Sequence, residues 1–172
     1  MRYSIAIVVA FCMLFAVSTA SAQVHVGVNF NIGTQPVWGP TGYDYVQYYY
    51  MPDIEVYYDV PHHRYYYFDH GRWIGRATLP RRYRDRDLYH TYKVVINERE
   101  PWRHHETYRA KYAMYKDHHD QPVIRDSREA KYFVNKDHPQ HDNWVREQRR
   151  AGEHRDDQPK NDDRRQRGDE HR

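Results

Sequence analysis

The sequence predicts an α+β fold: a small antiparallel β-meander of three to four strands with one packed helix, followed by a disordered C-terminal tail. Residues 48–80 contain short aromatic runs separated by turn residues, a pattern typical of strands joined by hairpins. Residues 102–115 place tyrosines at the helical period. From residue 117 onward the chain is highly charged and poor in apolar side chains, as disordered sequences are. These features divide the chain into residues 1–22, 23–47, 48–116 and 117–172.

Residues 1–22 have the pattern of a signal peptide. A short basic start, Met1-Arg2, precedes an apolar run over Ile5–Val17, and Ala20-Ser21-Ala22 forms a small-x-small cleavage site. The apolar run is shorter than the roughly 20 residues that a membrane-spanning helix needs. We therefore expect cleavage after Ala22, a periplasmic or secreted product, and no transmembrane span after cleavage.

The composition of the chain excludes several classes of site and partner. Cys12 is the single cysteine and lies in the signal peptide, so the processed protein has no disulfide, thiolate metal site or cysteine nucleophile. The formal net charge of +3 is too mild to indicate a nucleic-acid partner. The expected folded part is near the lower size limit for an isolated domain without disulfides, which makes homo-oligomerisation a hypothesis.

Residues 23–47 are expected to form an N-terminal strand and a Gly/Pro linker. Apolar and polar residues alternate over Val24–Phe30, which is the period of a strand with one buried face. Prolines and glycines over residues 36–42 then interrupt regular structure and form a loop that carries Trp38.

Residues 48–116 are expected to form an aromatic β-meander plus helix domain. The predicted strands are Ile54–Val60, Arg64–Phe68, Arg72–Thr78 and Lys93–Ile96. Pro61 and Gly71 are suited to the two tight turns between the first three. Alternation along the first strand places Val56 and Tyr58 in the core and turns Tyr57 and Asp59 towards solvent. Gly75 either leaves room for an aromatic ring across the strand pair or marks a bulge.

The helix of this region is predicted over Trp102–Tyr115. Pro101 fits the first turn of a helix, where its missing N–H has no partner to lose. Tyr108, Tyr112 and Tyr115 fall on one stripe, which is typical of a face that packs on a sheet.

Residues 117–172 are expected to form a charged, largely disordered tail. Its last part mixes acidic and basic residues with almost no apolar ones, so burial cannot offset the entropy of ordering. Weak helices are indicated only around residues 127–134 and 143–150.

No catalytic, cofactor-binding or metal-binding residue is assigned from the sequence, and we expect no enzyme. The processed chain contains one serine, Ser127, and no G-x-S-x-G motif. The chain has 13 histidines, some in adjacent pairs: His62-His63, His104-His105 and His118-His119. Imidazole suits Zn, Cu and Ni, but adjacent side chains point in different directions and no H-x-H or H-x-x-x-H occurs. Solvated turn histidines are one interpretation of the pairs, and metal binding is the alternative.

Two patterns indicate a binding function. Residues 41–70 contain five acids and one arginine, whereas residues 72–111 contain eleven Lys/Arg and five acids. These segments either neutralise each other or form a basic face for an anionic envelope polymer or lipid headgroup. Trp38, Tyr57 and Tyr66 either pack inside the fold or form a flat platform on which a glycan stacks.

The aromatic pattern is similar to that of a known group of proteins. The matching residues are Tyr48-Tyr49-Tyr50-x-Pro52, Val56-Tyr57-Tyr58, Arg64-Tyr65-Tyr66-Tyr67-Phe68, Gly71-x-Trp73, Leu79-Pro80, Lys93-Val94-Val95-Ile96, Pro101-x-x-His104-His105 and Lys111-Tyr112. This pattern resembles an uncharacterised family of small exported Tyr-rich bacterial proteins, to which no activity is attached. The resemblance implies an envelope or secreted location in a Gram-negative bacterium, and a structural role for His104-His105 at the start of the helix.

The sequence therefore predicts a non-enzymatic structural or binding module of the bacterial cell envelope. The expected partner is an envelope glycan or an anionic surface. A His-rich periplasmic binder of Zn, Cu or Ni is the alternative.

Overall fold

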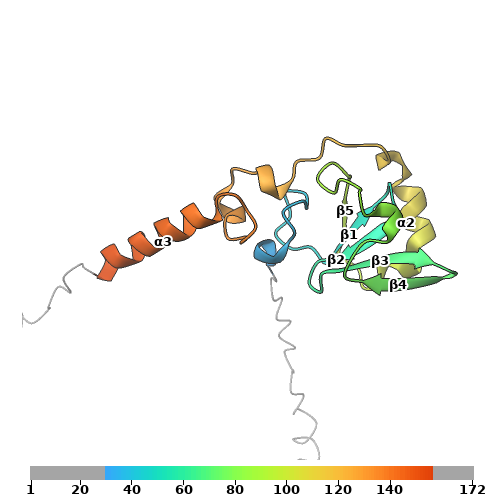
Figure 1. Ribbon diagram of the computed structural model, residues 1–172, viewed down its shortest axis with the longest axis horizontal. Coiled ribbons are helices and arrows are strands. Elements are labelled where there is room, and N and C mark those ends of the chain that lie inside the picture. The colour runs from blue at the N-terminus through green and yellow to red at the C-terminus, as the bar shows by residue number, and fades with distance from the viewer. Residues whose placement is uncertain (1–29, 157–172) are drawn as a thin grey trace, which may run out of the picture.

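The computed structural model describes residues 30–156. Within this range five strands form one antiparallel sheet in the order β4-β3-β2-β1-β5 (Figure 1). The strands are β1 (Tyr48–Met51), β2 (Val56–Asp59), β3 (Arg64–Asp69), β4 (Arg72–Arg76) and β5 (Val94–Ile96). The predicted α+β class with an antiparallel meander is confirmed. The predicted signal peptide and the predicted strand Val24–Phe30 lie outside the described residues, except for Phe30, which is not in a strand.

Three of the strands lie within predicted ranges, β3 extends one residue beyond its predicted range, to Asp69, and β1 was not predicted. β1 lies between β2 and β5, and its four residues are all buried. A strand that is buried on both faces shows no polar–apolar alternation, so this run of Tyr and Met lacks the signal by which strands are usually recognised.

The turns of the meander follow from residues that adopt the left-handed conformation. His70 and Gly71 have φ values of 47° and 79° and join Asp69 to Arg72, which are paired across the hairpin. Two successive positive φ angles are the mark of a type I′ turn, whose twist matches that of the flanking strands. The prediction of a short hairpin loop around Gly71 is therefore confirmed.

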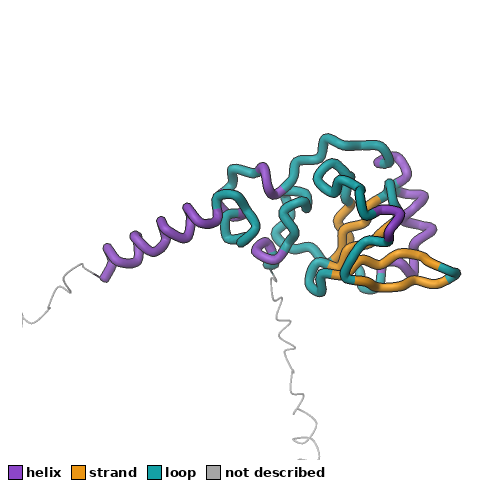
Figure 2. Tube along the Cα trace, viewed as in Figure 1, coloured by secondary structure: helices purple, strands orange, loops and turns teal. Residues whose placement is uncertain are grey.

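One face of the sheet is closed by loops, and we call it the loop-covered face. Its buried residues are Val46, Tyr49, Met51, Ile54, Val56, Tyr58, Val60 and Tyr67. Trp38 covers it from the loop before β1, with its ring centroid 4.9 Å from that of Tyr58. Leu79, Tyr83 and Leu88 cover it from the long connection between β4 and β5, which includes the 3-10 helix η3 (Arg81–Tyr83) (Figure 2).

The opposite face is covered by helices, and we call it the helix-covered face. Its buried residues are Tyr48, Tyr50, Tyr57 and Ile96. Trp102, Tyr108 and Tyr112 pack on them from the helical segment after β5. The prediction that Tyr57 and Asp59 face solvent is therefore wrong. Tyr57 is fully buried beneath the helical segment, and the buried Asp59 carboxylate bonds the main-chain N–H and the ring of His62.

The helix predicted over residues 102–115 is divided into three pieces. These are the 3-10 helix η4 (Pro101–His104), the α-helix α2 (His105–Lys111) and the 3-10 helix η5 (Ala113–Tyr115). Pro101 is in the first turn, as predicted. Tyr108 and Tyr112 pack on the sheet as expected, whereas Tyr115 stacks on Tyr92 with the centroids 4.5 Å apart.

Gly75 makes room for a cross-strand aromatic ring, which was one of the two predicted roles. It lies opposite Tyr66 in the β3–β4 register, and an added Cβ would lie 2.8 Å from the Tyr66 ring. The other side of this ring stacks on Trp102, with centroids 4.0 Å apart and planes inclined by 14°. Tyr66 therefore fixes η4 against the edge of the sheet.

The expected disorder from residue 117 does not hold for residues 117–156. Main-chain bonds join this stretch to the loop before β1, including Ile124 N–H to the Gly39 oxygen at 2.9 Å and Arg125 N–H to the Val37 oxygen at 2.8 Å. Val123, Ile124 and Tyr132 are buried there. A few apolar residues, together with hydrogen bonds to a neighbouring loop, order a stretch whose average composition suggests disorder. Residues 157–172 lie outside the described range.

The remaining helices of the described range belong to these loops or follow them. They are the 3-10 helices η2 (Ile32–Thr34), η6 (Ile124–Asp126) and η7 (Ala130–Tyr132) and the α-helix α3 (His141–Asp156). α3 projects away from the sheet (Figure 1). None of the helices described between residues 30 and 156 has the length and apolar character needed to cross a bilayer.

Candidate binding cleft

A cleft of about 520 Å³ opens where the helical segment meets the β3–β4 hairpin, and we call it the aromatic cleft. Its lining comes from the turn before β2, the β3–β4 hairpin, η4 and α2. The volume is within the range of small-molecule sites in proteins.

One wall of the aromatic cleft is made of rings. Phe68 and Trp73 come from opposite positions of the β3–β4 hairpin, and their ring centroids are 5.6 Å apart. Trp102 reaches the cleft from η4, where Tyr66 holds it in place. Phe68 is 51% exposed although it is large and apolar. An exposed aromatic ring beside two half-buried indoles is characteristic of binding surfaces.

A polar wall adjoins these rings and is built around His105, the first residue of α2, whose ring centroid lies 4.8 Å from that of Trp73. Its Nδ1 lies 3.1 Å from the hydroxyl oxygen of Tyr57, and its Nε2 lies 3.7 Å from a carboxylate oxygen of Glu55. Burial raises the pKa of Tyr57 and lowers the pKa of His105, so the phenol keeps its proton and the imidazole is neutral near pH 7. We therefore assign Tyr57 as the donor to Nδ1, which leaves the Nε2–H of His105 directed at Glu55.

Glu55 is held in the cleft wall by its backbone and by cations. Its φ of 55° ends the turn between β1 and β2, and its N–H bonds the Met51 oxygen at 2.9 Å. Arg109 and Lys116 approach the same carboxylate oxygen at 3.3 and 3.0 Å. A left-handed conformation is uncommon for a residue other than glycine, and strained residues of this kind are often found at binding sites.

This arrangement can hold a sugar ring. The apolar C–H face of a pyranose can lie on Phe68, Trp73 or Trp102, since aromatic rings offer a large rigid surface. Hydroxyl groups of the same sugar can bond Glu55 and Arg109 on the polar wall, because a few placed polar groups give orientation in a mainly apolar site.

The glycan platform predicted from the sequence does not form. Trp38 lies on the loop-covered face against Tyr49 and Tyr58, whereas Tyr57 and Tyr66 lie on the helix-covered face. The two tyrosines take part in internal packing, which was the alternative. No sequence signal indicated Phe68, Trp73 and Trp102 as a group, because they come from three elements that only the fold brings together.

The paired histidines serve separate local contacts. His62 bonds Asp59, and His63 bonds the hydroxyl of Tyr58 at 3.1 Å. The His104 ring bonds the Glu98 carboxylate at 2.7 Å, and its side chain makes no hydrogen bond that caps α2. The role at the start of the helix that the resemblance implies is therefore not filled by the His104 side chain. Within residues 30–156, no three or more His, Cys, Asp or Glu side chains are arranged to hold a metal ion. The metal-binding alternative is therefore not supported by any site in this part of the chain.

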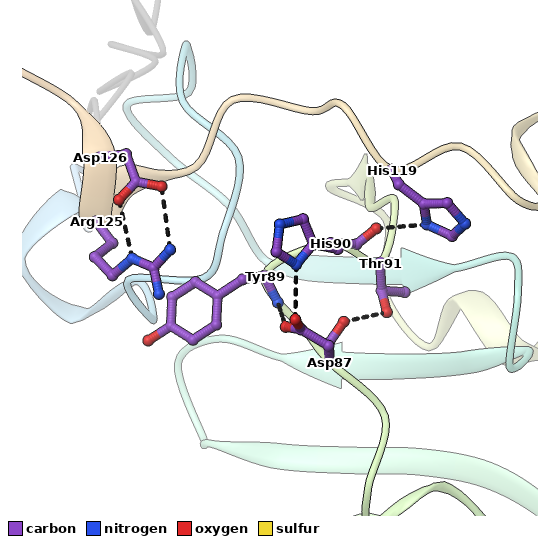
Figure 3. A network of polar contacts seen from close by, with 7 residues as sticks. All are labelled: Asp87, Tyr89, His90, Thr91, His119, Arg125 and Asp126. Carbon is purple, nitrogen blue, oxygen red and sulfur yellow. Dashed lines mark hydrogen bonds and ion pairs between the residues drawn. The ribbon is translucent and has the colours of Figure 1, made fainter.

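A second polar cluster joins the β4–β5 connection to the segment after η5 (Figure 3). Asp87 accepts bonds from the Tyr89 N–H and the His90 ring at 2.8 and 2.7 Å. The ring of His119 meets the main-chain oxygen of His90 at 2.9 Å, and not its imidazole. Arg125 pairs with Asp126 and lies 3.8 Å from the centroid of the Tyr89 ring.

The contacts of this cluster hold the β4–β5 connection against the segment after η5. Asp87 closes a turn by accepting a bond from the main-chain N–H two residues ahead, as aspartates commonly do in turns, and a second bond from the ring three residues ahead. Clefts of about 430 and 380 Å³ lie on either side, and His90 and His119 line both. Neither cleft has an exposed aromatic wall like that of the aromatic cleft, so we take the latter as the candidate functional site.

No protein-family model, no curated protein and no solved structure matches this chain. We therefore infer the function from the aromatic cleft and its chemistry.

Proposed function

We propose that this protein is exported to the bacterial cell envelope and acts there as a non-enzymatic binding module that holds a glycan in the aromatic cleft. The single observation that carries the proposal is the ring wall of the half-exposed Phe68 with Trp73 and Trp102, beside the polar wall of Glu55 and His105. Sugars have one apolar and one hydroxyl-bearing aspect, and the cleft offers a complementary surface to each.

The chemistry of the polar wall supports binding over catalysis. Both carboxylates of the lining are already ion-paired: Glu55 with Arg109 and Lys116, and Glu106 with Arg109 at 3.1 Å. Glycoside hydrolysis uses a pair of carboxyl groups, one on each side of the scissile bond. Here Arg109 contacts both carboxylates of the lining, and carboxylates engaged in this way are suited to accept hydrogen bonds from sugar hydroxyls.

Calorimetric titration of the purified protein with a neutral oligosaccharide, chitotetraose, tests the cleft. We expect measurable binding, and we expect Phe68→Ala to weaken it by about five- to tenfold, because one good aromatic contact contributes around 1 kcal/mol. Phe68 is half exposed, so the variant should keep the melting temperature of the parent protein within a few degrees.

Phe30→Ala is the matched control, since Phe30 is 65% exposed and does not line the aromatic cleft. It should bind chitotetraose as the parent does. Equal weakening by the two substitutions, or no binding by the parent protein, would contradict the proposal.

Export has an independent test. The protein recovered from the periplasmic fraction of a Gram-negative host should begin at Gln23 by N-terminal sequencing. Recovery from the cytosol with Met1 in place would show that the export part of the proposal is wrong.

A further inference from the structure

The positive charge of this chain is concentrated in one stretch. Residues 69–87 contain six arginines, three aspartates and no lysine or glutamate, which gives a formal charge of +3. The whole chain also has a formal net charge of +3, so the residues outside this stretch are neutral in sum. The stretch begins at the end of β3 and runs through β4 and η3 into the β4–β5 connection.

Arg72 and Arg76 lie on the same side of β4. Successive side chains of a strand point to opposite faces, so residues 72, 74 and 76 share one side. The middle residue is Ile74, which packs on the loop-covered face. Trp73 belongs to the other side of the strand and lines the aromatic cleft. The two arginines therefore lie beside the loop-covered face and point away from the aromatic cleft.

Arg82 of η3 extends this basic surface. Its guanidinium carbon lies 6.0 Å from the centroid of the Tyr67 ring, and Tyr67 is paired with Ile74 in the strand register. A guanidinium nitrogen of Arg82 also lies 3.8 Å from a carboxylate oxygen of Asp69, which is paired with Arg72 across the hairpin. One aspartate is thus flanked by two arginines that come from different elements.

We call Arg72, Arg76 and Arg82 the arginine surface. All three residues are exposed, and Asp69 is the one carboxylate within 4.0 Å of any of them among residues 30–156. The other aspartates of the stretch, Asp85 and Asp87, line the cleft of about 380 Å³ next to η3. Three arginines around a single carboxylate leave an excess of positive charge on this side of the hairpin.

The arginine surface fits an array of anionic groups better than a single small anion. Arg72 and Arg76 are four residues apart in an extended strand, which is about 13 Å, so they cannot share one phosphate. Neither of them lines any of the three clefts described above. β4 is the edge of the sheet, and the β3–β4 hairpin reaches the outer limit of the molecule (Figure 1). A broad partner can therefore approach it.

We propose that the arginine surface docks this protein on an anionic lipid bilayer, with the guanidinium groups bound to headgroup phosphates. Arginine presents paired N–H donors that match two oxygens of a phosphate. A bilayer presents phosphates over a broad area, which suits arginines that are spread along a strand edge without a groove. The aromatic cleft lies on the other side of β4 and stays open in this orientation. The inference does not depend on the glycan-binding proposal.

Co-sedimentation of the purified protein with lipid vesicles tests the inference. One vesicle type contains phosphatidylcholine alone, and the other contains equal amounts of phosphatidylcholine and the anionic phosphatidylglycerol. At low salt we expect the protein to bind the mixed vesicles and to bind phosphatidylcholine little. The binding should largely disappear at about 0.5 M salt, where the Debye length falls below about 5 Å.

Variants locate the binding on the molecule. Arg72→Gln/Arg76→Gln should weaken binding to the mixed vesicles by roughly 10- to 25-fold, because each basic residue near an anionic lipid surface contributes roughly fivefold. Arg149→Gln/Arg150→Gln makes the same change of net charge on the exposed surface of α3 and should bind as the parent does. Asp69→Asn removes the one acid of the arginine surface and should tighten binding by about two- to fivefold. A gain of this kind cannot come from misfolding, and thermal melting verifies that the double variants fold.

The affinity of Arg72→Gln/Arg76→Gln for chitotetraose should be unchanged, so failure of the glycan proposal and failure of this inference are distinguishable. Equal binding to the two vesicle types, or equal losses in the two double variants, would overturn the inference. Binding of dextran sulfate without binding of the mixed vesicles would also overturn it and would assign the arginine surface to a soluble polyanion.

Discussion

The two faces of the sheet are both rich in tyrosine, yet one is closed and the other is partly open. On the loop-covered face, segments before β1 and after β4 close over the whole surface. On the helix-covered face the cover is the helical segment Pro101–Tyr115, whose Trp102, Tyr108 and Tyr112 pack on the sheet. This cover is incomplete at the β3–β4 hairpin, where Phe68 is 51% exposed and lines the aromatic cleft with Trp73. The extent of the covering segment thus decides where a tyrosine-rich sheet becomes a binding surface.

The largest expected difference between the faces is in the cost of removing a ring. Tyr49 is fully buried on the loop-covered face, and Tyr49→Ala should lower the free energy of unfolding by about 3–5 kcal/mol. Phe68→Ala at the open end should lower it by less than about 1 kcal/mol, because half of this ring already faces water. Urea denaturation of both variants measures the two values. Similar costs would mean that the faces do not differ in closure.

Lys93 is a destabilising residue of the loop-covered face. Its ammonium lies 5.8 Å from the centroid of the Trp38 ring, its side chain is buried, and its Nζ has no hydrogen-bond partner among residues 30–156. Burial lowers the pKa of Lys93 to about 8, from 10.5. Lys93→Met should therefore stabilise the protein by about 3 kcal/mol at pH 7, as judged by urea denaturation.

The pH dependence gives this prediction its control. Between pH 8 and 10.5 the unfolded chain holds a proton on Lys93 that the folded protein has released, so the stability of the parent protein rises with pH over this window. At pH 7 the lysine is protonated in both states, and the full penalty is present. Lys93→Met should lack the rise. A stabilisation by Met that is the same at pH 7 and pH 9.5 would show that titration of the amine is not its cause.

The helix-covered face depends on a close fit at Gly75. Gly75→Ala should lower the free energy of unfolding by about 1–3 kcal/mol, because the new methyl group displaces Tyr66 and its stack on Trp102. It should also weaken binding of chitotetraose, since Trp102 lines the aromatic cleft. Gly152→Ala in α3 meets no neighbouring atom and should be neutral or slightly stabilising. A neutral Gly75→Ala would mean that Tyr66 does not hold η4 in place.

The smallest expected effect compares neighbouring residues of β1 on opposite faces. The Tyr49 hydroxyl donates to the Gln35 side-chain oxygen at 3.0 Å, whereas the Tyr50 hydroxyl is buried without a partner in the described range. Tyr49→Phe should cost about 1–2 kcal/mol, because it leaves the buried Gln35 oxygen unpaired. Tyr50→Phe should be neutral or stabilising. Differential scanning calorimetry of the two variants makes the comparison, and a larger loss for Tyr50→Phe would contradict it.

Much of the sheet could be predicted from the sequence, because its turns carry distinctive residues. Gly71 indicated the tight hairpin between β3 and β4, and alternation indicated β2 and its core residues. β1 could not be recognised, since burial on both faces removes alternation. The prediction that Tyr57 faces solvent was wrong for the same reason. The period of a strand shows that two faces exist, but it does not show whether a helix covers the second face.

The aromatic cleft and the order of residues 117–140 could not be predicted for a related reason. Phe68 and Trp102 are far apart in the sequence, and their proximity depends on the path of the chain after β5. Asn135 is polar and lies outside regular structure, yet it is buried. Its side-chain amide donates a hydrogen bond to the main-chain oxygen of Gln35 at 2.5 Å, which satisfies the buried polar group. Composition measures the average polarity of a stretch, whereas order here depends on a few specific bonds to a distant loop.

The four tryptophans allow one measurement to test the difference between the faces directly. Trp73 and Trp102 line the aromatic cleft, Trp38 covers the loop-covered face, and Trp144 lies on α3. We expect that titration with chitotetraose, followed by the indole N–H signals in ¹⁵N-correlated NMR spectra, shifts the Trp73 and Trp102 signals and leaves the Trp38 and Trp144 signals in place. Shifts confined to Trp38 or Trp144, or four unmoved signals at saturating sugar, would contradict binding at the open end of the helix-covered face.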